Sequence, residues 1–362
     1  AKNEDQLRKS VAATAIIGGI LSLFVVFIGA VGLFPLLQFL GTPSAIVSQS
    51  YLYIATIVNG VAVTFAYNLC AGLLRAVGDS LAALYFLIIA AVLNILLDLY
   101  FITQLHLGVQ SAGIATIIAQ GISALLCLLY IRKKVPFLLP HRKDFVWDKE
   151  LYQDLLSQGL AMGLMTSIVS IGTVTLQSAI NQLGTTIISA QVAARRIMSF
   201  AVLPITAIAS SITTFISQNF GAEQFQRIKK GVTIANLLSW VWSVLVAALI
   251  FFTSPSLTSF ISGSTNPDLI ANASLYLQIS SCFYPILASL IILRNALQGM
   301  GKKLTPLTSS FIELFGKIFF VLWIIPHTGY MGVILCEPLI WIPMTLQLII
   351  IYRKIRYQLL TE

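Results

Sequence analysis

Charged side chains are scarce in this 362-residue chain. Asp, Glu, Lys and Arg make up 10% of it, against about 25% in soluble globular domains. Hydrophobic residues make up 57%, and the mean hydropathy is +0.90. This composition excludes a water-soluble fold and intrinsic disorder. The apolar runs are continuous rather than alternating, which excludes a transmembrane β-barrel. We therefore predict an all-α polytopic membrane protein.

Residues for metal and nucleophilic chemistry are also few, with four Cys and three His. The cysteines lie inside apolar runs without CxxC spacing, and the histidines are isolated. The sequence contains no GxxxxGK[ST], HExxH or DDxxD motif. We therefore expect neither an enzyme nor a bound cofactor. The net charge of +9 is assigned to basic cytoplasmic loops rather than to nucleic-acid binding.

Ten apolar stretches are long enough to cross the hydrocarbon core, which takes about 20 residues. They are 11–40, 48–74, 80–103, 108–131, 151–182, 186–217, 231–252, 268–299, 304–325 and 330–352. Pro204 and Pro338 interrupt two of them, where we expect kinks.

Lys and Arg lie before the first stretch and after every second one, and the alternate loops carry none. The positive-inside rule therefore places both visible ends of the chain in the cytoplasm. We expect a multi-pass protein of the plasma membrane. Four cations lie inside apolar stretches and need a partner: Arg195, Arg196, Arg294 and Lys317.

The polar, basic segment 132–149 divides the chain into a first lobe, 1–131, and a second lobe, 150–362. The lobes repeat at an offset of 221 to 223. AKNEDQLRKSV (1–11) matches AEQFQRIKKGV (222–232), and Gly78 matches Gly301. Internal repeats are typical of secondary transporters. Both copies have the same orientation, so the lobes are related by an axis along the membrane normal.

The second lobe has six apolar stretches and the first has four. The repeat offset therefore predicts that about 70 residues, carrying two further helices, precede Ala1. We expect an N-terminally truncated form of a transporter with two lobes of six helices each.

Acids inside a membrane are functional candidates, because they are costly to bury. Asn94 and Asp98 lie one turn apart on one helix face, and Thr116 lies at similar depth in the next helix. Their carboxylate, amide and hydroxyl oxygens suit Na⁺, and the same carboxylate can carry a proton. Alternatively, Asp98 only pairs with a neighbouring polar group.

The repeat places charged residues in the second lobe at the positions that hold neutral polar residues in the first lobe. Asn94 maps onto Lys317, and Thr116 maps onto Glu337. We hypothesise that Lys317 is a built-in cation in the equivalent site, neutralised by Glu337 or by Glu313. One of the adjacent arginines is expected to pair with these acids, and Arg196 is assigned to that pair. The alternative is an ordinary structural ion pair.

Several motifs resemble the multidrug and toxic compound extrusion (MATE) family. They are LLRAVGDS (73–80), VLNILLDLYFI (92–102), LGVQSAGIATIIAQ (107–120), SQNFGAEQFQRIKKG (217–231) and GVILCEPLIW (332–341). Gln218 to Ala222 is similar to the family's QxxGA motif in the second lobe. The resemblance implies a twelve-helix, two-lobe, inverted-V fold, of which this chain carries helices 3–6 and 7–12.

The resemblance also implies a function. MATE transporters export bulky amphipathic or cationic compounds by alternating access, coupled to Na⁺ or H⁺. Small-molecule drugs or toxic metabolites and the lipid bilayer would be the partners of a monomer. The alternative is a lipid-linked oligosaccharide flippase of the same superfamily, which the basic Arg195, Arg196 and Lys317 keep open.

By resemblance, Asn94, Asp98 and Thr116 match the first-lobe ion site of the family. Ala71 stands where some members carry a further Asn, and Asn68 is the nearest substitute. Four polar residues of the second lobe either line a substrate cavity or form hydrogen bonds between helices: Gln177, Asn181, Gln191 and Arg195.

Overall fold

The computed structural model describes residues 4–39, 44–105 and 108–361. All regular elements in these ranges are helical. Eight helices are long and apolar enough to cross a membrane, and two bent pairs raise the number to ten. Each of the ten predicted stretches coincides with one of these helices or pairs. The chain forms two compact units, an N-unit (Lys2–Leu156) and a C-unit (Ser157–Glu362).

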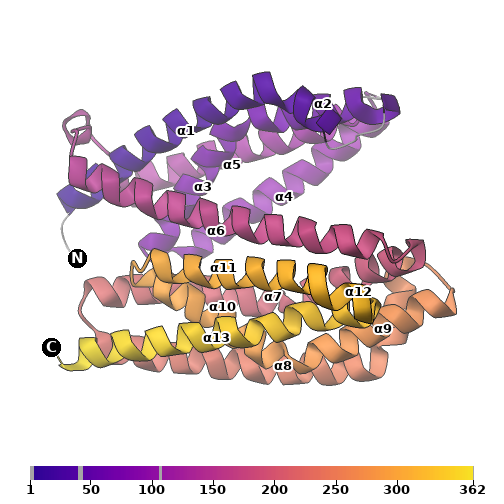
Figure 1. The fold of residues 1–362 in the computed structure, drawn as a ribbon. Helices are drawn as coiled ribbons and strands as arrows, with labels where there is room; N and C mark the ends of the chain where they lie inside the picture. Colours follow the sequence, from indigo (N-terminus) through magenta and orange to yellow (C-terminus); the bar gives the residue numbers. More distant parts are fainter. Residues whose placement is uncertain (1–3, 40–43, 106–107, 362) are drawn as a thin grey trace. The chain divides into compact units, whose positions relative to one another are not determined.

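The N-unit is built from five long helices and the first part of a sixth (Figure 1). α5 packs against α2, α3 and α4, so it lies at the centre of this unit. The helices are α1 (Glu4–Phe39), α2 (Ser44–Asn59), α3 (Val61–Ala76), α4 (Ser80–Thr103), α5 (Gln110–Lys134) and the start of α6 (Lys149–Asn181).

The segment between α5 and α6 folds onto the start of α1. It contains two short 3₁₀ turns, η1 (Pro136–Leu138) and η2 (Arg142–Asp144). The Asp144 side chain is 3% exposed, accepts a hydrogen bond from the His141 backbone N–H at 2.7 Å, and lies 3.7 Å from Arg8. This predicted linker is therefore fixed within the N-unit by a buried carboxylate.

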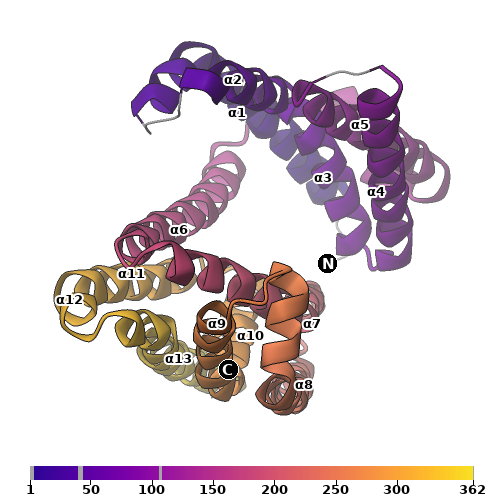
Figure 2. The same ribbon diagram turned by 90° about the vertical axis from the view of Figure 1, so that its right-hand side faces the viewer.

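The C-unit contains the rest of α6 and the remaining helices. They are α7 (Thr185–Gly221), α8 (Phe225–Ser262), α9 (Pro267–Cys282), α10 (Tyr284–Gly299), α11 (Leu304–Phe319), a π-helical turn η3 (Phe320–Ile324), α12 (Ile325–Thr328) and α13 (Tyr330–Thr361). α9 and α10 pack against α7 and α8 (Figure 2). In the most apolar window of α13, 44% of the residues are buried, more than in any other described span, so a charge on α13 must find its partners inside the protein.

The helix bounds reproduce the sequence repeat. Adding 223 to the bounds of α2 and α3 gives those of α9 and α10, and both pairs are bent, by 45° and 58°. The repeat-related glycines Gly78 and Gly301 have φ values of +92° and +72°. Only glycine adopts this conformation without strain, so each unit uses the same turn before its α4 or α11.

The bends do not lie at the prolines that the sequence suggested. α7 and α13 continue as single helices through Pro204 and Pro338. The break between α2 and α3 lies instead at Gly60, where an added Cβ would overlap the Ile117 side chain of α5. The bend therefore accompanies a close approach between two helices, which hydrophobic periodicity does not reveal.

Close helix packing in the C-unit gives one stability prediction. A Cβ at Gly299 would lie 2.8 Å from the Thr213 carbonyl oxygen and 3.2 Å from Ile216. We expect Gly299→Ala to lower the free energy of unfolding by about 1–2 kcal/mol, because overpacking outweighs the gain in helix propensity. The matched control is Gly163→Ala, which meets no atom within 4 Å. Denaturant titration in mixed micelles measures both, and equal effects would contradict the prediction.

Candidate functional site

The N-unit brings two of the predicted ion-site residues into contact. Asn94 of α4 donates a hydrogen bond from Nδ2 to Thr116 Oγ1 of α5 at 3.3 Å. Thr116 in turn donates to the Ala112 carbonyl, one turn earlier on α5. The Thr116 oxygen is thus held on the inner faces of the two helices.

Asp98 lies one turn beyond Asn94 on the same helix. Its side chain is half-buried, and its Oδ1 atom is buried without a hydrogen-bond partner in the described part of the chain. A carboxylate oxygen left unsatisfied in an apolar setting is costly. A cation or a proton would satisfy it, which fits the chemistry of an ion site.

Asn68 does not join this group through a hydrogen bond that the structure describes. It is exposed on α3, and its side-chain amide donates to the Thr64 carbonyl of its own helix. Thr64 in turn donates to Gln120 of α5 at 2.6 Å. The Asn68 amide nitrogen therefore makes a local helical contact, and its assignment as a fourth ligand stays a prediction.

The C-unit contains a continuous chain of charged contacts, which we call the charge cluster: Arg195, Glu337, Lys317, Glu313 and Arg294. Lys317 Nζ lies 2.9 Å from Glu313 Oε1 and 3.3 Å from Glu337 Oε1. The Lys317 side chain is 3% exposed. Both acids that the sequence offered as alternatives therefore contact the lysine at once.

The two ends of the charge cluster are closed by arginines. Arg195 Nη2 donates to Glu337 Oε1 at 3.2 Å, and Tyr276 donates to the other Glu337 oxygen at 3.3 Å. At the far end, Arg294 lies 4.0 Å from Glu313 and donates twice to Ser309. Tyr276 and Ser309 were not predicted, because a lone hydroxyl in an apolar run gives no sequence signal.

The structure corrects the assignment of the adjacent arginines. The sequence predicted Arg196 in the ion pair and Arg195 at a cavity. Arg195 makes the ion pair and also borders a hollow, whereas Arg196 is exposed with no ion pair in the described part of the chain. Adjacent helical residues point about 100° apart, so the register of α7 against α13 decides which arginine faces Glu337.

Helix geometry also fixes where the Lys317 side chain runs. An added Cβ at Gly172 of α6 would lie 3.1 Å from the Lys317 Cδ atom. The alkyl chain therefore uses the space that the glycine leaves, and the ammonium group emerges between the two carboxylates. This packing restricts the ammonium to one position.

The other three residues predicted to line a cavity, Gln177, Asn181 and Gln191, have different hydrogen-bond partners. Gln177 donates to Asn181 at 2.8 Å within α6. Gln191 is 1% exposed, accepts from the Tyr330 hydroxyl at 3.1 Å, and has a buried Nε2 without a partner in the described residues. Gln191 therefore links α7 to α13.

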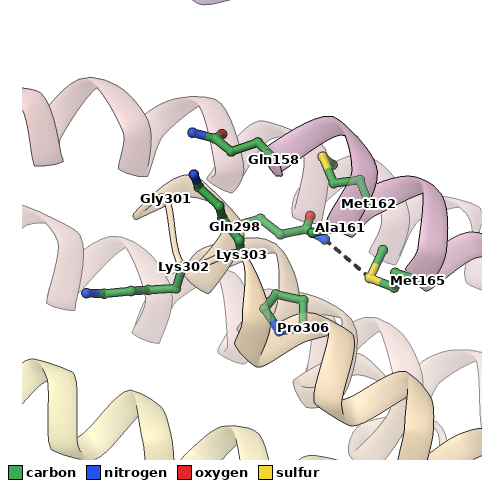
Figure 3. Close-up of a pocket in the computed structure, with 9 residues that line it drawn as sticks. All are labelled: Gln158, Ala161, Met162, Met165, Gln298, Gly301, Lys302, Lys303 and Pro306. Atoms are coloured by element: carbon green, nitrogen blue, oxygen red, sulfur yellow. Dashed lines mark hydrogen bonds between the residues drawn. The ribbon is translucent and has the colours of Figure 1, made fainter. Parts of the chain in front are cut away.

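The hollows of the C-unit differ in size. A hollow of about 400 Å³ is bordered by Arg195 and Glu337 together with apolar side chains of α7, α10 and α13. The pocket in Figure 3, between α6 and the turn after α10, holds about 30 Å³. That volume has room for only a water molecule or two. A further hollow of about 410 Å³ lies between α7 and α8 beside Arg227 and Lys230. The hollow beside Arg195 and Glu337 is the candidate for a ligand because it also borders the buried charge cluster.

The adjacent arginines give a second stability prediction. Arg195→Gln breaks a partly buried ion pair, and we expect it to lower the free energy of unfolding by about 1–3 kcal/mol. Arg196→Gln removes the same charge from an exposed position and should leave stability unchanged within error. Unfolding titrations of the two variants provide the comparison. A larger loss for Arg196→Gln would contradict the register of α7.

Comparison with known proteins identifies relatives. The family model MatE matches residues 1–100 and 161–323. The "Probable multidrug resistance protein YpnP" of Bacillus subtilis (strain 168) is 28% identical over 291 residues, which is 79% of this chain and 64% of YpnP. The "Probable multidrug resistance protein YoeA" of the same organism is 25% identical over 335 residues, 90% of this chain and 72% of YoeA.

The fold also has close counterparts among solved structures. One described as "Crystal structure of MATE in the bent conformation" matches with a TM-score of 0.88 at 19% identity, covering 99% of this chain and 84% of the other. At this identity the likeness supports the fold alone. The chain spans 64% and 72% of the lengths of the two curated relatives.

Proposed function

Because the chain belongs to the MatE family, we propose that it acts in secondary active efflux of bulky amphipathic or cationic compounds in exchange for Na⁺ or H⁺. The two curated relatives are named as probable multidrug resistance proteins, which favours efflux over the flipping of lipid-linked oligosaccharides. We place the protein in the plasma membrane as a monomer with both visible ends in the cytoplasm.

The coupling ion would bind in the N-unit. The observation that carries this proposal is the buried Oδ1 atom of Asp98, which has no hydrogen-bond partner among the residues the structure describes. It lies one helical turn from the Asn94–Thr116 hydrogen bond. Asp98 supplies the negative charge, and Asn94 and Thr116 supply neutral oxygens. Hard oxygen ligands of this kind suit Na⁺, and the carboxylate alone suffices for H⁺.

The C-unit would have no second ion site of this kind. Lys317 and Glu337 occupy the repeat positions of Asn94 and Thr116, and their side chains lie 3.3 Å apart, as do those of Asn94 and Thr116. We propose that the ammonium group stands where the N-unit binds its ion. Glu313 and Glu337 pair with it, so one unit couples to the ion and the other is permanently filled.

Transport by the purified protein in proteoliposomes tests this proposal. Ethidium movement is followed while a Na⁺ gradient or a pH gradient is imposed in turn. We expect one gradient to drive ethidium uphill, and monensin or a protonophore to abolish the movement. Ethidium flux equal to that of protein-free liposomes under both gradients would overturn the proposal.

A further inference from the structure

The charge cluster of the C-unit is not neutral. It contains three cations (Arg195, Lys317 and Arg294) and two carboxylates, those of Glu313 and Glu337. These cations form no ion pair with a third carboxylate in the described part of the C-unit. The cluster therefore carries one uncompensated positive charge inside an apolar bundle, where such a charge is costly.

Arg195 is the most accessible cation of the cluster. Its side chain is 31% exposed, whereas the other four members of the cluster range from 3% to 15%. Glu337 Oε1 accepts from both Arg195 and Lys317, so one oxygen serves two cations. The hydrogen bond of Arg195 to Glu337 is made by Nη2, and Nη1 has no hydrogen-bond partner among the described residues. The guanidinium therefore keeps the two Nη1 hydrogens for a further anion.

Arg195 borders the hollow of about 400 Å³, a volume in the range of small-molecule sites. Most of the remaining lining is apolar and comes from three helices. It includes Met198 and Val202 of α7, Leu287 of α10 and Trp341 of α13. The hollow therefore places the Arg195 guanidinium, which has free N–H donors among the described contacts, beside a mainly apolar lining.

We propose that this hollow binds amphipathic organic anions, with the carboxylate, sulfonate or phosphate on Arg195 and the apolar body against Val202, Leu287 and Trp341. The proposal rests on the efflux function and narrows its amphipathic substrates to anions at this position. Charge-assisted hydrogen bonds from a guanidinium are among the strongest in proteins, and the anion would neutralise the cluster.

Equilibrium dialysis tests the proposal on the purified protein in phosphatidylcholine nanodiscs. The probes are 1-naphthylacetate and 1-naphthylmethylammonium, which share one apolar body and differ in charge. We expect the anion to bind more tightly than the cation. Arg195→Gln should weaken anion binding about tenfold or more. Arg353→Gln removes an exposed charge at the far end of α13 and should leave anion binding unchanged.

A second variant keeps the test independent of cluster stability. Ser199 is exposed and borders the same hollow. Ser199→Trp should fill the hollow and lower anion binding about tenfold while all five charged residues remain. Anion binding equal to that of the unmodified protein in Ser199→Trp, or cation binding as tight as anion binding, would overturn the proposal.

A lipid headgroup is the competing source of an anion. Displacement of 1-naphthylacetate by dihexanoyl phosphatidylglycerol but not by dihexanoyl phosphatidylcholine would assign the hollow to lipid and overturn the substrate proposal. Binding requires no ion gradient, so its outcome is separate from that of the flux assay. Lost binding with intact ethidium flux would refute only the anion site.

Discussion

Asp98→Asn is expected to lower the apparent affinity for the coupling ion about 10- to 100-fold. The change keeps the size of the side chain and removes its negative charge. A bond to a charged group contributes about 1.5–3 kcal/mol, which corresponds to this range. The buried Oδ1 atom has no partner in the described residues, so the ion is the group that loses its ligand. Proteoliposome flux against Na⁺ concentration or pH measures the shift.

Two further variants make this result specific to the N-unit site. Asp268→Asn removes one carboxylate from an exposed position in the first turn of α9 and should leave ion dependence unchanged. Asn94→Leu removes the amide that contacts Thr116 and should shift ion dependence in the same direction as Asp98→Asn, by a smaller factor. Ion dependence within twofold of the unmodified protein in Asp98→Asn would refute the N-unit site.

The ion-site group shows what spacing along a helix can predict. Asn94 and Asp98 share a face because they are four residues apart, and the next helix must return beside the first. The Asn94–Thr116 contact follows from these two facts. The contact of Asn68 with Thr64 does not follow, because an exposed amide can bond within its own helix.

Contacts set by helix rotation could not be predicted. The choice between Arg195 and Arg196 depends on how α7 is turned toward α13. The bends at Gly60 and Phe283 likewise depend on which helix approaches which. The predicted kinks at Pro204 and Pro338 lie inside continuous helices and break neither of them.

The repeat explains why the two clusters share a geometry and differ in charge. Helices at the same repeat positions, α4 with α5 and α11 with α13, pack against each other in each unit. A polar pair at equivalent positions therefore meets in both units, whatever its chemistry. In the N-unit this pair is neutral and lies one turn from Asp98, whose Oδ1 has no partner among the described residues. In the C-unit the pair is itself a salt bridge.

Lys317→Met is expected to lower the free energy of unfolding by about 3 kcal/mol. Removing one partner of a buried ion pair costs about 3–5 kcal/mol. The lower end applies because Arg195 and Arg294 still contact the two carboxylates. Methionine keeps the unbranched chain that runs past Gly172, so the loss reports the charge rather than a cavity. The control Lys354→Met, at an exposed position, should be near neutral.

The same variant distinguishes a built-in cation from an ordinary ion pair. Without the ammonium group, two carboxylates that both contacted Lys317 Nζ, at 2.9 and 3.3 Å, face each other. If Lys317 fills an ion position, the Lys317→Met protein should regain stability in Na⁺ or at low pH. The double variant Lys317→Met/Glu337→Gln should be more stable than Lys317→Met and lose that response. Unfolding titrations at several Na⁺ concentrations and pH values measure this response. If the Lys317→Met protein folds and its stability changes with neither Na⁺ nor pH, Lys317 is only part of a structural ion pair.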